Sequence, residues 1–567
     1  MIFRLRNLAA VFAVSSVLSF GAAQPPVILI SIDTLRADHL SAYGYRKIRT
    51  PNIDSFAEHG TLFAHADAQV PLTGPSHASL FTSTYPFQNR VEENAERVPP
   101  GAVTLASVLR SHGYKTAAFV SSVFLEKQMG LDQGFDTYDS PFSYTALSPL
   151  SGSMFFGAET HNPNLGRARR VGALAVRAAV QWLQANRDQP VFVFLHLYDL
   201  HKPYGLPPGF KASPGVTGYD AQLEYVDHVL GLFRKTLVET GWWDRSLIVL
   251  LSDHGESLGE HGEASHGYFI YQSTLWVPLM FHWPLGAPAC PARIEQPAGL
   301  IDVAPTILDA LNLPAPRSFE GHSLLDPAFE RPVYAESLHA HDSFGWAPLR
   351  SLRAGNFKYI HAPRPELFDL KTDPHESRNL IASQPERARD LRNQLTKLLA
   401  RYPPMEPAQS AQVSPETRAL LGSLGYLAGG PAAKLGDSGP DPKDRLPEFH
   451  LYEDAMIAVF EGRLAEGIST LRRIVALDPH NTLARRDLGA CYLERQEYAK
   501  ARTELERVVV AAPDDYMTQY ELGVVDEHLG LVPQALAHLQ AACTLAPESS
   551  QCRHELDAAR NASVAKQ

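Results

Sequence analysis

The sequence predicts an α/β protein with a mostly parallel β-sheet flanked by helices, a small antiparallel C-terminal subdomain, and an all-α solenoid of repeats. Three near-continuous apolar runs, at residues 27–32, 191–195 and 247–251, predict buried parallel strands. Strands covered on both faces lose the polar–apolar alternation of half-exposed strands. Helical patterns at 171–184 and 219–238 lie between the runs. A 34-residue period near the C-terminus predicts the repeats.

Length and charge limit the organisation of the chain and its partners. At 567 residues the chain is too long for one hydrophobic core, so we expect two or three domains. The net charge of −11 argues against a polyanionic partner, and we expect no nucleic acid to bind.

The N-terminus has the pattern of a signal peptide over residues 1–23. Arg4 and Arg6 precede an apolar run at 8–20, and small residues follow at 21–23. An uncleaved N-terminal anchor is the alternative, although the run is shorter than the ~20 residues of a membrane span. No later run reaches ~20 apolar residues, so we expect no transmembrane segment in a mature chain that is periplasmic or secreted.

The four cysteines form no metal-binding pattern. Export permits a disulfide, and Cys543 with Cys552 is the candidate pair. Ordinary buried thiols are the alternative.

Polar residues of distinctive chemistry follow each predicted strand. Asp33 follows the first run, Asp199 and His201 follow the second, and Asp253 and His254 follow the third. Ligands of open α/β sheets bind beyond the carboxyl ends of the strands. We therefore expect these side chains to share one site.

The segment around Thr73 is the sharpest local feature. Gly74 and Pro75 interrupt the chain, and a helix is predicted from Ser76, so that Thr73 precedes a helix N-terminus. Backbone N–H groups and the helix dipole favour an anionic group there. A threonine hydroxyl is a poor nucleophile unless a base or a metal ion activates it. The alternative for Thr73 is a simple helix cap.

Three companions supply that activation. Asp33, Asp253 and His254, with the Thr73 oxygen as fourth ligand, suit one divalent metal ion: Mn, Zn, Ca or Mg. Such an ion lowers the pKa of a coordinated hydroxyl and fixes its direction.

Several ordered segments resemble the sulfatase family of the alkaline phosphatase superfamily. The resemblance covers about residues 25–400 and implies an alkaline phosphatase/sulfatase-like fold and a metal-dependent ester hydrolase. The matching segments are 30–38, 50–54, 71–83, 251–262, 366–370, 373–374 and 379–380.

The sequence departs from this family where the sulfatases are diagnostic. Their Cys/Ser-x-Pro-x-Arg motif yields a formylglycine nucleophile, but here Thr73 and His77 stand at its first and last positions. Oxidised threonine is a ketone and not an aldehyde, so the formylglycine mechanism does not apply. Thr34 also replaces the usual second Asp. The resemblance then implies cleavage of phosphate mono- or diesters, or phosphonate esters, through a covalent phospho-threonine.

The resemblance implies roles for further residues. His201 and Lys202 would contact the substrate, and His266 would act as general acid for the leaving group. Asn94 would donate to a phosphoryl oxygen, as an Asn does in the pyrophosphatase branch. For each histidine a structural role is the alternative. A second metal ion on Asp199, His201 and His266 is disfavoured, because the Asp-x-x-x-His spacing of two-metal members is absent.

From about residue 350 the pattern of predicted elements changes. Residues 349–360 read as a hairpin and 366–370 as a further strand of the small antiparallel subdomain. The tail resembles about three tetratricopeptide repeats with a capping helix, a plain helical bundle being the alternative. The concave groove of such a solenoid commonly binds a peptide or protein partner. The alternative is that the tail packs against the catalytic domain and shapes its cleft. The residues that recur in phase are Pro479, Pro513 and Pro547, Leu488-Gly489 and Leu522-Gly523, Ala501 and Ala535, and Leu505 and Leu539.

The expected organisation is a signal peptide at 1–23, a catalytic domain at 24–426, a linker at 427–447 and repeats at 448–560. The leading function is hydrolysis of an anionic ester substrate. The alternatives are sulfuric ester hydrolysis without formylglycine, a phosphoglycerol-type headgroup transferase, and a tetratricopeptide adaptor with an inactive sulfatase-like domain.

Overall fold

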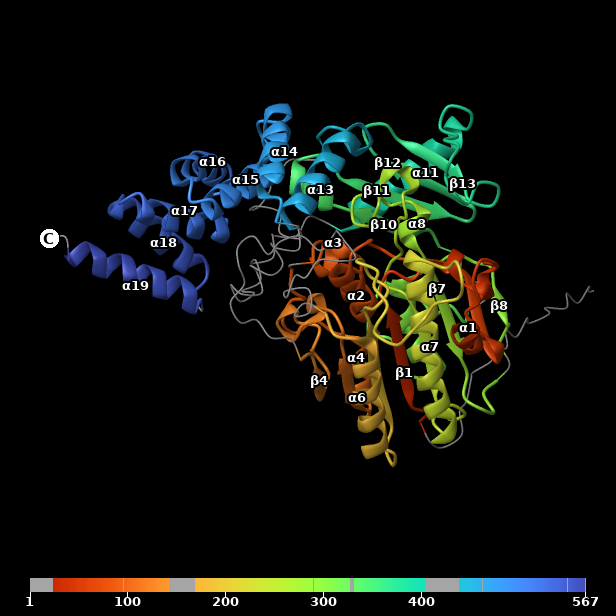
Figure 1. Cartoon of the computed structure of the whole chain (residues 1–567). Coiled ribbons are helices and arrows are strands. Elements are labelled where there is room, and N and C mark those ends of the chain that lie inside the picture. The colour runs from red at the N-terminus through yellow and green to blue at the C-terminus, as the bar shows by residue number, and fades with distance from the viewer. Residues whose placement is uncertain are drawn as a thin grey trace, which may run out of the picture.

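The computed structural model describes residues 24–94, 96–141, 169–288, 290–326, 331–402, 438–460, 462–547 and 549–565. The expected signal peptide and residues 427–437 of the expected linker lie outside these ranges. Figure 1 shows a large sheet domain, a smaller sheet above it, and a helical tail that extends away from both.

Nine strands of the described residues form the large sheet, in the order β4-β3-β5-β1-β6-β7-β2-β8, with β9 paired to β2. The strands β4, β3, β5, β1 and β6 are parallel, and β7 is antiparallel to both of its neighbours. The three apolar runs become β5, β1 and β6, which lie side by side at the centre. The strands are β1 Val27–Ile32, β2 Gly60–Asp67, β3 Lys115–Phe119, β4 Thr137–Asp139, β5 Val191–Leu197, β6 Leu247–Leu251, β7 Trp276–His282, β8 Arg293–Ile294 and β9 Ala298–Gly299.

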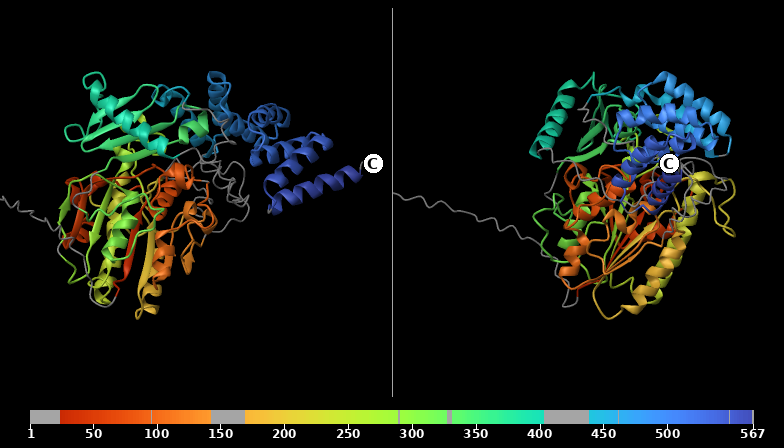
Figure 2. Two further views of the ribbon diagram at one scale, coloured as in Figure 1. Left: turned by 180° about the vertical axis from the view of Figure 1, so that it is seen from behind. Right: turned by 90° about the vertical axis from the view of Figure 1, so that its left-hand side faces the viewer.

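Helices cover both faces of this sheet, as the apolar runs predict (Figure 2). Side chains of β1 alternate between two cores: Val27 and Leu29 pack with α2, α4 and α9, whereas Ile28 and Ile30 pack with α1, α6 and α7. The mostly parallel α/β architecture is therefore confirmed. These helices are α1 Pro51–Glu58, α2 Thr73–Thr82, α4 Leu105–Ser111, α6 Gly172–Ala185, α7 Gly218–Glu239 and α9 Val303–Ala310.

The predicted antiparallel subdomain is also confirmed. Its four strands are β10 Val333–Ser337, β11 Leu349–Ala354, β12 Phe357–His361 and β13 Glu366–Asp369, paired in sequence order. Helix α11, Pro385–Arg401, packs Leu391 and Leu395 on one face of this sheet. Buried Arg353 of β11 contacts both carboxylate oxygens of Asp67 of β2, at 3.0 and 2.9 Å, and so ties the two sheets together.

The tail consists of helical hairpins in the predicted phase. Each repeat crosses closely at a glycine: a Cβ added to Gly489 or Gly523 would lie 2.7 or 2.6 Å from Leu505 or Leu539. The small residue of each Leu-Gly pair is therefore required by packing. The helices are α13 Leu446–Phe460, α14 Leu464–Leu477, α15 Thr482–Glu494, α16 Tyr498–Ala511, α17 Tyr516–His528, α18 Val532–Leu545 and α19 Ser550–Ala565.

A disulfide joins Cys543 of α18 to Cys552 of α19, the candidate pair named from the sequence. Helix α13 begins two residues before the expected start of the repeats. Within the described ranges, none of the helices combines the length and the apolar character that crossing a lipid bilayer requires.

Short helices connect the larger elements. They are α3 Pro86–Asn89, α8 Gln272–Leu275 and α10 His339–Phe344, and the 3-10 helices η1 Ala37–His39, η2 Ser41–Tyr43, η3 Val123–Leu125, η4 Lys127–Met129, η5 Glu260–Gly262, η6 Leu300–Asp302 and η7 Pro442–Asp444.

Candidate active site

The carboxyl ends of β1 and β6 bring two aspartates and a histidine together. Asp33 directly follows β1, and its backbone N–H donates to the Leu197 carbonyl of β5 at 2.9 Å. Asp253 and His254 follow β6, and the His254 N–H donates to the Asp253 carboxylate at 2.9 Å. All three side chains are fully buried. Parallel neighbouring strands end at the same edge, which explains the convergence.

Thr73 lies at the start of α2 and points into this group. The helix begins at Thr73 itself, earlier than the predicted start at Ser76, and the Ser76 N–H donates to the Leu72 carbonyl at 3.0 Å. Gly74 and Pro75 fit the first turn, where N–H groups lack intrahelical acceptors. Thr73 Oγ1 donates to Asp33 Oδ2 at 3.1 Å and lies 3.4 Å from His254 Nε2. The predicted nucleophile thus lies beside the predicted metal ligands.

The charge of this group calls for a cation. Asp33 Oδ1 and Asp253 Oδ2 are buried and have no hydrogen-bond partner among the described residues. Burial raises the pKa of Asp33 to about 7, and burial together with the Asp33 charge raises the pKa of Asp253. Burial lowers the pKa of His254, but the two carboxylates outweigh it and the net shift is upward.

One divalent cation would compensate these charges. Ligand atoms of Asp33, Asp253 and His254 lie within 4.8 Å of one another. Carboxylate oxygens with one imidazole suit Mn²⁺ or Zn²⁺ as well as harder cations. The residues present therefore fit the metal ion that the sequence predicts.

Two histidines that the sequence analysis did not assign to the site border the same carboxylates. His77, His196 and Asp253 also place ligand atoms within 4.8 Å of one another. His77 Nδ1 donates to the Thr73 carbonyl at 2.8 Å, and Nε2 accepts from Ser31 Oγ at 3.0 Å. Both nitrogens are engaged and burial lowers the pKa of His77 to about 4, so His77 orients the first turn of α2 as a neutral ring.

His196 is the stronger candidate for a further ligand. It lies on β5 opposite Ser31 of β1, fully buried, with Nε2 3.5 Å from Asp33 Oδ2. Neither ring nitrogen makes a hydrogen bond within the part of the chain that the structure describes. The available signal in the sequence was a polar residue inside a strand that is buried on both faces.

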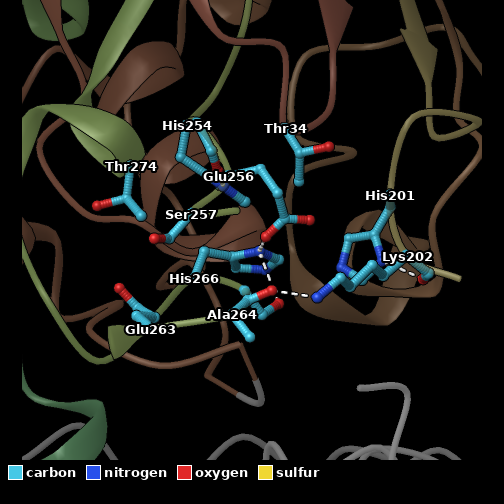
Figure 3. A network of polar contacts seen from close by, with 12 residues as sticks. Thr34, His201, Lys202, His254, Glu256, Ser257, Glu263, Ala264, His266 and Thr274 are labelled. Carbon is cyan, nitrogen blue, oxygen red and sulfur yellow. Dashed lines mark hydrogen bonds and ion pairs between the residues drawn. The ribbon is translucent and has the colours of Figure 1, made fainter. Parts of the chain in front are cut away.

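A second layer of residues surrounds His254 (Figure 3). The His266 ring lies 4.4 Å from the His254 ring, and its Nδ1 lies 2.9 Å from Glu256 Oε1, with both side chains fully buried. Burial lowers the pKa of His266, and the Glu256 carboxylate is placed to stabilise its protonated form. Glu256 was missed in the sequence, although it stands two residues after His254.

His201 approaches from the segment that follows β5. Its ring lies 5.0 Å from the His266 ring, and its Nδ1 donates to the Lys202 carbonyl at 2.6 Å. Nε2 is buried without a hydrogen-bond partner in the described chain. Burial lowers the pKa of His201 to about 3, so the ring is neutral, and with Nδ1 as the donor Nε2 is the acceptor nitrogen.

Asn94, Lys202 and Asp199, the remaining residues singled out from the sequence, each bond to a different backbone group. Asn94 Oδ1 accepts from the Gly74 N–H at 2.8 Å, which leaves the buried Nδ2 without a hydrogen-bond partner in the described ranges. The Lys202 ammonium donates to the Ala264 carbonyl (Figure 3). Asp199 Oδ2 accepts from the Gly172 N–H at 2.8 Å and caps α6. The second metal set on Asp199, His201 and His266 is therefore not assembled, because Asp199 faces a helix N-terminus.

This fold and the buried carboxylate–histidine site, a candidate metal site, are those of an ester hydrolase of the alkaline phosphatase/sulfatase superfamily. The chain belongs to the sulfatase family, whose sequence model, "Sulfatase", matches residues 25–313. A model described as "N-sulphoglucosamine sulphohydrolase, C-terminal" matches residues 259–403. Models of the tetratricopeptide repeat match residues 459–520 and 494–550.

Relatives and solved structures agree with this assignment. Arylsulfatase K of Mus musculus is 24% identical, with 67% of this chain and 80% of that protein covered. The multifunctional alkaline phosphatase superfamily protein PehA of Trinickia caryophylli is 26% identical, with 66% and 94% covered. The phosphonate monoester hydrolase of Agrobacterium radiobacter has the same fold, with a TM-score of 0.54, 22% identity, and 66% and 96% of the two chains covered.

Proposed function

We propose that this protein is an exported, metal-dependent hydrolase that cleaves phosphate mono- or diesters, or phosphonate esters, through a covalent phospho-threonine at Thr73. The observation that carries the proposal is the Thr73 hydroxyl, 3.1 Å from Asp33 and 3.4 Å from His254, at the first turn of a helix. A helix N-terminus favours the anionic group that the substrate would bring.

The residues divide the reaction between them. The Thr73 hydroxyl passes its proton to Asp33 Oδ2, which accepts its hydrogen bond at 3.1 Å, and the Thr73 oxygen attacks phosphorus as the O–P bond to the leaving group breaks. The leaving oxygen takes a proton from His266. Water then attacks phosphorus, gives a proton to His266 and releases Thr73, which takes its proton back from Asp33. Asn94 Nδ2, which has no hydrogen-bond partner in the described chain, donates to a phosphoryl oxygen, while His201 contacts the substrate beside it.

A divalent cation held by Asp33, Asp253 and His254 would supply Lewis-acid charge that lowers the pKa of the Thr73 hydroxyl and offsets charge on a phosphoryl oxygen. His196 is available as a further ligand, because its nitrogens have no other hydrogen-bond partner in the described residues.

Phosphorus chemistry is favoured by the residues at the nucleophile motif. Threonine cannot become formylglycine, and neutral His77 occupies the position of the formylglycine motif's arginine. The likeness to a phosphonate monoester hydrolase supports the fold of such an enzyme. Sulfuric ester hydrolysis is the second candidate, favoured by relatives named arylsulfatase.

The test is a side-by-side assay of aryl phosphate monoesters, diesters, phosphonates and sulfates on protein loaded with Mn²⁺, Zn²⁺, Ca²⁺ or Mg²⁺. We expect phosphorus esters to be cleaved and Thr73→Ala to abolish turnover, while Thr73→Ser retains part of it. Mass spectrometry of acid-quenched enzyme should find phosphate on Thr73. Cleavage of sulfates alone, or full activity of Thr73→Ala, would refute the proposal.

The proposal includes a location and a partner. The N-terminal pattern supports a periplasmic or secreted enzyme, and the disulfide in the tail is compatible with an oxidising compartment. The repeats would hold a peptide or protein partner, as solenoids of this kind do. Fractionation of the native host and detection of the cleaved chain would test the location.

A further inference from the structure

The loop of residues 259–268 carries His266 into the active site and is folded tightly upon itself. The Gly259 N–H donates to the Glu263 carbonyl at 3.0 Å, and the Tyr268 N–H donates to the Glu263 carboxylate at 2.9 Å. The Glu263 side chain is only 1% exposed. These bonds tie both ends of the loop to Glu263, which stands three residues before His266.

Helix α13, the first helix of the repeat tail, covers the tip of this loop. His450 Nε2 donates to the Gly262 carbonyl at 2.7 Å, and the Phe449 ring lies 4.1 Å from the Tyr268 ring. Phe449 and Tyr268 are 2% and 4% exposed, so each ring buries the other. A Cβ added to Gly262 would lie 3.0 Å from Leu446 Cδ1, which shows how closely the helix approaches.

The catalytic domain holds the same loop from its other sides. Lys202, next to His201, donates to the Ala264 carbonyl, and Ser337 of β10 donates to the Gly267 carbonyl. The Tyr268 ring also contacts His339 at 4.8 Å. Figure 3 shows the Lys202–Ala264 contact beside the Glu256–His266 pair. The loop is thus clamped between the catalytic domain and the tail.

The clamp is continuous with the solenoid. Tyr452 of α13 donates to Asp487 of α15 at 2.6 Å, and its ring contacts Phe344 of α10 at 5.6 Å. One side chain therefore touches both the second repeat and the catalytic domain. The position of α13 over the loop is thus supported by α15 and by α10 as well as by the loop itself.

We propose that α13 is a positioning element of the active site, in which Phe449 and His450 hold the 259–268 loop so that His266 faces the leaving group. The repeat tail then contributes to turnover in addition to holding a partner. The effect on turnover rests on the proposed role of His266, whereas the effect on loop order does not.

Hydrogen exchange on the full chain tests the loop without reference to catalysis. In Phe449→Ala we expect the amides of Gly259 and Tyr268 to exchange at least about tenfold faster, because the covering ring is lost. Tyr520→Ala is the matched control, since it removes a buried ring from the distal core of the tail. Unchanged exchange in Phe449→Ala, or equal acceleration in Tyr520→Ala, would overturn the proposal.

Leaving-group dependence tests the catalytic consequence. Phe449→Ala should lose at least about tenfold in kcat on an alkyl ester and less than about threefold on the 4-nitrophenyl ester, which needs no proton on departure. Phe449→Leu should restore most of the loss, and Tyr520→Ala should show none. Equal loss on both esters would overturn the positioning role. A wild-type chain that cleaves no ester would refute the proposed function, and the exchange result would still decide the role of α13.

Discussion

Glu256 offers a quantitative test of how the active site handles the leaving group. Its carboxylate lies 2.9 Å from His266 Nδ1, and both side chains are fully buried. Glu256→Gln keeps the shape and a hydrogen-bond acceptor but removes the negative charge. Besides His266, the Glu256 carboxylate accepts from the Tyr204 hydroxyl at 3.4 Å and is hydrogen-bonded to Ser265 of the loop.

The expected magnitude follows from the change in bond type. A hydrogen bond to a charged group contributes about 1.5–3 kcal/mol and a neutral one about 0.5–1.5 kcal/mol. The protonated imidazole therefore loses about 1–1.5 kcal/mol of stabilisation, which corresponds to about a tenfold fall in rate where its proton is needed.

The assay is a series of aryl phosphate or phosphonate esters whose leaving groups span a wide range of basicity. We expect Glu256→Gln to lose about tenfold on the poorest leaving group and almost nothing on 4-nitrophenolate. In a His266→Ala background the same substitution should have no further effect. A uniform loss across the series, or additive losses in the double variant, would refute the reasoning.

Three further predictions concern the metal site, the tail and the join between the sheets. Saturation with Mn²⁺ or Zn²⁺ at about 100 Kd should stabilise the folded chain by about 2.7 kcal/mol, and a chelator or Asp253→Asn should abolish the rise in Tm; a Tm indifferent to metal would contradict the site. Burial raises the pKa of Glu521 from 4.5 to about 8, so the folded tail binds the proton more tightly than the unfolded chain. Its unfolding free energy should fall by up to about 1.4 kcal/mol per pH unit between about pH 5 and 8, and Glu521→Gln should flatten this slope in urea titrations; a slope that persists would refute the assignment. Arg353→Met strands buried Asp67 and should cost about 3–5 kcal/mol in urea unfolding, with recovery when Asp67→Leu is added; a loss below about 1 kcal/mol would mean that the ion pair is dispensable.

Much of the fold could be predicted because its signals are local. The runs that became β1, β5 and β6 are apolar on both faces, and only the interior of a parallel sheet accommodates such strands. The repeats of the tail could be predicted from glycines that recur in phase, such as Gly489, whose missing side chain leaves room for Leu505. In both cases the physical cause lies within a few residues or one repeat period.

The site could be predicted only where residues stand at strand ends or match a motif. Asp33, Asp253 and Thr73 satisfied that condition, and the structure brings them together. Their catalytic and ligand roles stay predictions. His196 and Glu256 were missed because their partners come from other strands and loops, although His196 is a polar residue within a buried strand and Glu256 stands two residues after His254. The expectation that Asp199 joins the shared site was wrong for the same reason, because its actual partner, the Gly172 N–H of α6, lies 27 residues earlier in the chain.

The packing of α13 against the 259–268 loop sets a rule for dissecting or re-engineering this chain. Removing the repeat tail by a cut within the linker would expose Tyr268 and Phe344 to solvent, because Phe449 and Tyr452 of α13 contact them. The truncated enzyme would then have an exposed apolar surface. A chimaera with a different binding module should instead keep α13 and its partner α14, and join the new module after Leu477. For protein engineering, the functional boundary between the catalytic domain and the repeat tail therefore lies within the solenoid, after its first helical hairpin.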